Sequence, residues 1–135
     1  MRTQRTRFIP FVLAATALWL VAAGCSDDPF APYEPEINNE AGTFQLQATG
    51  VEGVSLTRSY AWTSEAATAN INQSTTVDRG TATLRIFDGE GTQIYERSLA
   101  SNGTYESDAG TGTDWTIRII LTDYTGTVNF RVESP

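Results

Sequence analysis

The sequence contains no histidine, no lysine and only one cysteine among its 135 residues. The side chains that most often act as general bases or covalent nucleophiles are therefore missing, apart from carboxylates, hydroxyls and tyrosines. Two carboxylates could still hydrolyse a glycoside, but nothing in the sequence brings a particular pair together. We therefore expect a protein that is not an enzyme, with no catalytic residues and no required cofactor. Because a disulfide cannot form within the chain, its fold must depend on packing.

The single cysteine, Cys25, follows a basic and then an apolar segment. Three arginines lie within the first seven residues, and residues 8–23 form an apolar run interrupted by Pro10 and Thr16. Sixteen helical residues rise about 24 Å, less than the ~30 Å hydrocarbon core, so a cleaved signal fits better than a permanent span. An ordinary secretory signal with an incidental cysteine and an uncleaved anchor are the alternatives.

Val21-Ala22-Ala23-Gly24-Cys25 resembles the lipobox of bacterial lipoproteins, an aliphatic residue followed by two small residues and cysteine. Ala22 departs from the commonest pattern, which has leucine at that place. The resemblance implies that residues 1–24 are a signal peptide and that Cys25 is acylated, for example with palmitate, which anchors the exported chain in the lipid bilayer. Ser26 follows the cysteine in place of aspartate. By similarity to enterobacterial sorting signals, this favours an outer-membrane lipoprotein facing the periplasm or the cell surface.

The charge of the mature chain is strongly negative. Removing residues 1–24 takes away three arginines and leaves six basic and sixteen acidic side chains, a net charge of −10. This balance argues against nucleic acid or anionic lipid as the main partner. The remaining 111 residues are enough for one domain with its own core.

Residues 25–41 are expected to form the lipidated cysteine and an extended tether. The segment is rich in acidic residues, is interrupted by three prolines and shows neither helical nor strand periodicity. Fourteen such residues, 26–39, could lift a domain about 45 Å from the bilayer. Phe30 and Tyr33 are the exceptions, and we expect them to pack on the adjacent domain, with a docking motif as the alternative.

From residue 42 to residue 135 the apolar residues alternate with period two, and glycine-rich turns recur every eight to twelve residues. This pattern predicts an all-β domain, a single antiparallel β-sandwich of about eight strands with a jelly-roll or immunoglobulin-like arrangement. Trp115 alternates with apolar residues and is predicted to lie in the core. The expected strands are residues 44–48, 56–63, 66–73, 81–87, 92–99, 104–107, 115–121 and 128–132.

Three segments carry a family resemblance. They are residues 80–91, residues 110–117, which end in Asp-Trp-Thr-Ile, and residues 124–130. Their order is similar to that in bacterial pre-peptidase C-terminal domains. The resemblance implies a small secreted β-sandwich of a kind that often accompanies proteases and in some cases binds calcium or collagen. It covers about residues 80–132, and its motifs are common to extracellular β-sandwiches, so it supports the fold more than a function.

Two kinds of side chain are candidates for a binding site. Carboxylates crowd the predicted turns, where free carbonyl oxygens could complete a calcium site, although singly each also suits a turn: Asp88, Glu90, Asp108, Asp114 and Asp123. Aromatic residues are numerous for a small domain and could stack on sugars. The aromatic candidates are Tyr60, Trp62, Tyr105 and Tyr124, although alternation with Tyr60 favours a buried Trp62.

These observations predict a membrane-anchored, non-enzymatic lipoprotein of the cell envelope that acts as an accessory or interaction module. We expect it to hold a protein or glycan partner through its loops or an exposed sheet face. The alternative is a calcium-dependent or carbohydrate-binding β-sandwich module.

Overall fold

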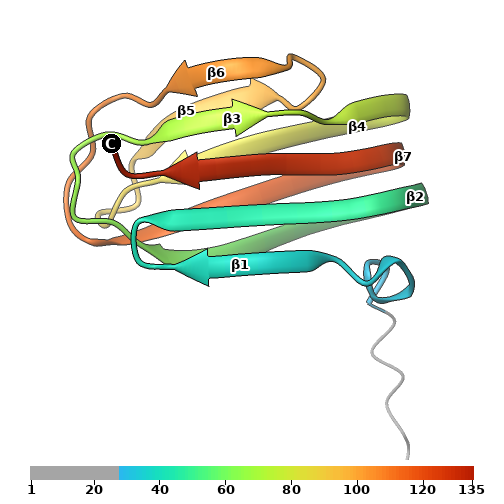
Figure 1. Cartoon of the computed structure of the whole chain (residues 1–135), viewed down its shortest axis with the longest axis horizontal. Helices are drawn as coiled ribbons and strands as arrows, with labels where there is room; N and C mark the ends of the chain where they lie inside the picture. The colour runs from blue at the N-terminus through green and yellow to red at the C-terminus, as the bar shows by residue number, and fades with distance from the viewer. Residues whose placement is uncertain (1–27) are drawn as a thin grey trace, which may run out of the picture.

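The computed structural model describes residues 28–135, which form seven β-strands and one short 3₁₀ turn (Figure 1). The predicted signal peptide and Cys25 lie outside the described residues. The predicted all-β, antiparallel fold is confirmed. The elements are η1 Ala31–Tyr33, β1 Glu36–Glu40, β2 Thr43–Thr63, β3 Asn70–Gln73, β4 Thr76–Phe87, β5 Gln93–Ser98, β6 Gly103–Glu106 and β7 Asp114–Glu133.

The long strands β2, β4 and β7 bend near their middles, so one antiparallel sheet folds over into two layers (Figure 1). The five-strand layer has the order β1-β2-β7-β3-β6 and uses the first half of β2 and the second half of β7. The four-strand layer pairs the second half of β2, the first half of β7, β4 and β5. We call the bent end, around residues 49–55, 78–80 and 122–126, the bend end, and the opposite end the loop end.

The bends reduce the eight expected strands to six, and the unexpected strand β1 brings the number within residues 28–135 to seven. The predicted strands 44–48 and 56–63 are the two halves of β2, and 115–121 and 128–132 are the two halves of β7. Pairing between β2 and β7 continues through three register shifts between Ala48 and Leu56. The glycines read from the sequence as strand ends, Gly50 and Gly53, have positive φ and bend the strand without ending it.

The bend is tightest where β7 passes β4. Gly126 has φ +150°, and a Cβ there would collide with the backbone carbonyl of Thr76. Beside it, the buried Tyr124 donates a hydrogen bond from its hydroxyl to the same carbonyl at 2.6 Å. Only glycine therefore lets the two strands approach this closely.

The core lies between the layers and is built from the inward half of each alternating strand. Phe44 packs against Phe130 with ring centroids 5.9 Å apart, and Trp62 meets Trp115 edge-on at 5.7 Å. Trp115 is 1% exposed, which confirms its predicted place in the core.

The segment predicted as a tether is in large part folded onto the domain. Glu36–Glu40 form strand β1, which pairs with β2 from Glu36↔Gln47 to Glu40↔Thr43. Phe30 is fully buried in the core, and Tyr33 packs against it, as expected of these two aromatic residues. The prediction of an extended spacer through residue 41 is therefore wrong from Phe30 onward. The sequence of β1 is polar and lacks the apolar alternation by which a strand is predicted.

Candidate binding groove

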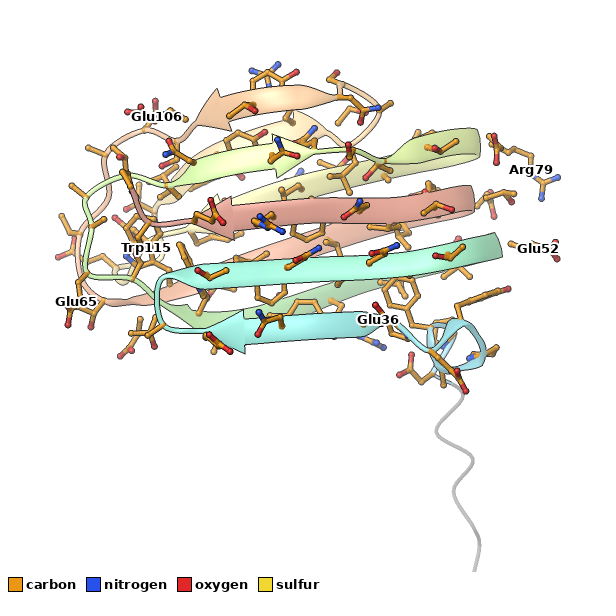
Figure 2. All side chains as sticks on the ribbon, viewed as in Figure 1. Glu36, Glu52, Glu65, Arg79, Glu106 and Trp115 are labelled. Atoms are coloured by element: carbon orange, nitrogen blue, oxygen red, sulfur yellow. The ribbon has the colours of Figure 1, made fainter. Side chains whose placement is uncertain are left out.

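The outer face of the five-strand layer is polar throughout. The residues of β1, β2, β7 and β3 that alternate with the core residues carry amide, hydroxyl or charged side chains, as Figure 2 shows for the layer nearest the viewer. The register places Gln47 opposite Asn129, and Gln45 opposite Arg131, so polar side chains form rows across the strands.

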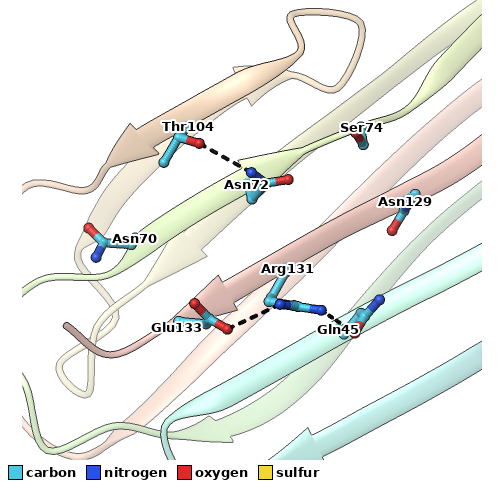
Figure 3. Close-up of a pocket in the computed structure, with 8 residues that line it drawn as sticks. All are labelled: Gln45, Asn70, Asn72, Ser74, Thr104, Asn129, Arg131 and Glu133. Carbon is cyan, nitrogen blue, oxygen red and sulfur yellow. Dashed lines mark hydrogen bonds and ion pairs between the residues drawn. The ribbon is translucent and has the colours of Figure 1, made fainter.

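A groove with a volume of about 400 Å³ lies on this face (Figure 3). Four strands, β2, β3, β6 and β7, contribute to its walls, together with Ser74 just after β3. Its lining residues are Gln45, Asn70, Asn72, Ser74, Thr104, Asn129, Arg131 and Glu133.

Hydrogen bonds hold both sides of the groove. On one side, Arg131 donates from its guanidinium to Gln45 Oε1 at 3.2 Å and forms an ion pair with Glu133 at 3.5 Å. On the other side, Asn72 Nδ2 donates to Thr104 Oγ1 at 3.1 Å. The only cation of the groove is thus held by neighbours on its own layer.

Several polar groups of the groove are left for a ligand. Within residues 28–135, the side-chain amides of Asn70 and Asn129 and the hydroxyl of Ser74 make no hydrogen bond to the protein. Amides and hydroxyls can both donate and accept. A groove with this lining suits a neutral ligand rich in hydroxyl groups, such as a sugar chain.

The predicted aromatic site is not assembled. Trp62 is 2% exposed and Tyr124 is fully buried, so neither presents a face to a ligand. Tyr60 is half-buried against Phe44, and burial raises the pKa of its hydroxyl. Tyr105 lies under the guanidinium of Arg97, 3.8 Å from the ring centroid. The prediction of an aromatic stacking surface from these four residues is therefore wrong, because the alternation that places them on strands also turns them toward the core, where two are buried and two pack against it.

The five predicted calcium ligands are also not brought together. Asp123 lies at the bend end, next to Gly80, whereas Asp88 lies in the loop-end hairpin that contacts Thr111. Within the part of the chain that the structure describes, no three histidine, cysteine or acidic side chains lie close enough to hold a metal ion. Glu90, Asp108 and Asp114 form no such cluster with the other two.

Asp88 instead has a structural role. Its carboxylate is buried and accepts hydrogen bonds from the backbone N–H groups of Glu90, Thr92 and Thr111 at 2.9–3.0 Å. These N–H donors, that of Thr111 first, lower the pKa of the carboxyl group. A carboxylate already surrounded by N–H donors has little capacity left for a cation, so it ties the hairpin at residues 88–92 to the loop at 107–113.

Sequence reasoning did not identify the groove. The polar members of each strand are visible in the sequence, as in Gln45 and Gln47 or Asn70 and Asn72, but alternation marks them only as the solvent-facing half. The signal that could have found it is the concentration of amides on several strands. The sequence does not say that those strands are neighbours in one layer.

Within residues 28–135, no helix is long and apolar enough to cross a membrane. No protein-family model matches the chain, and a search of curated proteins finds no similar one. The resemblances to lipoprotein signals and to pre-peptidase C-terminal domains therefore stay predictions.

Proposed function

We propose that this chain is a lipid-anchored, non-enzymatic binding module of the bacterial cell envelope, and that the groove of the five-strand layer binds a glycan. The observation that carries the binding role is the lining of the groove, where two amides and one hydroxyl that have no partner among the described residues lie beside one fixed guanidinium. The anchoring role rests on Cys25 and the signal-like segment before it. Ser26 supports the outer membrane as the destination.

The position of Asp28 changes the geometry of such an anchor. Only Ser26 and Asp27 separate Cys25 from Asp28, where the described residues begin. Three residue steps reach at most about 10 Å. An acylated Cys25 would therefore hold the bend end close to the bilayer, in place of a domain lifted about 45 Å above it. The loop end would then face away from the membrane.

Labelling with an alkyne analogue of palmitate in bacterial cells tests the anchor. We expect the wild-type chain and a Ser26→Ala control to be labelled and recovered with membranes, and the Cys25→Ser variant to be unlabelled. Equal labelling of Cys25→Ser and wild type would contradict the anchor and leave the groove untouched.

Binding of the full-length chain, purified in detergent, to a glycan array and to soluble peptidoglycan fragments tests the groove. Asn70→Ala and Asn129→Ala should each weaken binding roughly two- to tenfold, the value of one hydrogen bond. The control, Gln93→Ala, removes an exposed amide from β5 in the other layer. Absence of any retained glycan, or equal binding by all variants, would overturn the glycan proposal.

A further inference from the structure

A second feature lies on the opposite outer face, that of the four-strand layer. There Arg85 of β4 and Arg118 of β7 are direct cross-strand partners. Side chains in such positions leave the backbone with Cβ atoms about 4.5–5.5 Å apart, and like charges directly opposite each other are destabilising. The chain after residue 24 has only six basic side chains and a net charge of −10, and two of these six arginines lie directly opposite each other.

The surrounding residues supply one negative charge for the two positive ones. Read across the layer, the row in register is Ser59, Arg118, Arg85 and Glu96. The row on one side is Thr57, Ile120, Thr83 and Ser98, and the row on the other is Ala61, Thr116, Phe87 and Gln93. Neither neighbouring row contains a carboxylate, so Glu96 alone faces the arginine pair across the strands.

Each guanidinium contacts the protein through part of its surface, and its terminal NH₂ groups remain available. Arg118 donates from Nε to Ser59 Oγ at 2.9 Å, and its Cζ lies 4.6 Å from the centroid of the Phe87 ring. Arg85 has its Nε 3.5 Å from Glu96 Oε2, an ion pair without a hydrogen bond, and this buried Nε has no hydrogen-bond partner. Within residues 28–135, the terminal NH₂ groups of both arginines make no hydrogen bond to the protein.

We propose that Arg85 and Arg118 form a binding site for a carboxylate group of an acidic ligand. Two guanidiniums beside one glutamate leave a net charge of +1 at this site. A bound monoanion brings this charge to zero, whereas a bound phosphate dianion leaves an excess negative charge. The planar guanidinium fork matches the two oxygens of a carboxylate. Thr83 and Thr116, which flank the pair in the neighbouring rows, add hydroxyl donors. This site is on the other layer from the groove and does not depend on the groove binding a glycan.

The test is an NMR titration of the full-length chain, ¹⁵N-labelled at arginine, with sodium acetate at constant ionic strength. We expect saturable shifts of the Nε–H signals of Arg85 and Arg118, and no saturable shift at Arg131, which serves as the internal control. Inorganic phosphate at the same concentration should give the weaker response.

Two variants make the test specific. Arg85→Gln and Arg118→Gln should each weaken acetate binding by at least about tenfold, since a charge-assisted hydrogen bond is lost. Arg97→Gln, a matched change on β5 at a guanidinium stacked on Tyr105, should leave acetate binding unchanged. Shifts that rise linearly and in parallel at all arginines, or acetate binding that survives in both variants, would overturn the proposal.

Discussion

Replacing Phe30 with alanine would show whether the N-terminal segment belongs to the folded domain. Phe30 is fully buried among the core residues, and the Arg58 guanidinium lies over its ring, 5.7 Å from the centroid. Asp28 holds that guanidinium through two hydrogen bonds of 2.6 and 3.2 Å. The aromatic ring, the arginine and the carboxylate together attach this segment to β2.

The size of the effect follows from the burial. Deleting a fully buried phenylalanine side chain costs about 3–5 kcal/mol, because transfer free energy is lost and a cavity remains. Domains of this size are stable by about 5–15 kcal/mol in total, so the variant should lose a large share of its free energy of unfolding. The expected fall in melting temperature is roughly 10–20 °C.

Urea unfolding of the full-length chain in detergent, followed by the fluorescence of the buried Trp62 and Trp115, measures this loss. The matched control is Phe87→Ala, which removes the same side chain from a half-buried position on the outer face and should cost distinctly less. If the segment around Phe30 were an independent tether that did not pack on the domain, Phe30 would be a surface position, where substitutions stay within about 0.5 kcal/mol. A loss that small for Phe30→Ala would refute the reasoning.

Three further predictions concern the interior. Tyr95 donates to Gln73 Oε1 at 2.7 Å, so Tyr95→Phe should cost about 1–3 kcal/mol in urea unfolding, because a buried amide oxygen loses its partner; a neutral effect would contradict this. Burial raises the pKa of Tyr95 to about 12, so its contribution to stability is complete below the unfolded pKa near 10 and is lost as pH rises through about 12. Burial also raises the pKa of Tyr124, so its contribution is likewise lost only above the unfolded value. An alkaline titration in which the tyrosinate absorbance of all five tyrosines develops together near pH 10 would count against both. The pKa of Asp88 is lowered, so its contribution to stability is present above the unfolded pKa of about 3.9 and is lost as pH falls through the lower folded value. Asp88→Asn should therefore reduce the fall of the free energy of unfolding at acid pH, and an unchanged fall would argue against the role of this carboxylate.

The sequence predicts the fold well where one side of a strand is apolar. Trp115, Ile117, Ile119 and Leu121 alternate without interruption, and they lie in the core as predicted. The sequence does not predict β1, where Asn38, Asn39 and two glutamates give no apolar alternation. An edge strand that is exposed on both faces does not need such alternation. The sequence predicts two strands in place of each bent strand, because glycines mark both a turn between strands and a bend within one.

The candidate site could not be predicted for a different reason. Its residues come from strands separated by up to 88 positions, as Gln45 and Glu133 show. Only the pairing register brings them side by side, and the register is a property of the whole sheet. Aromatic residues bind sugars in many modules, but in this domain the candidate aromatics pack in or against the core.

The attachment at β1 also decides how the molecule would carry mechanical load. A pull on the N-terminal side enters through Asp28 and Phe30, then passes along β1 into β2, which is also a wall of the groove. A ligand held in the groove would therefore load the five-strand layer along its strands, while β4 and β5 of the four-strand layer would bear little of the force. The first contacts to yield would be the Asp28–Arg58 ion pair and the five paired positions of β1. Tension would thus release the edge of the layer before the core opens.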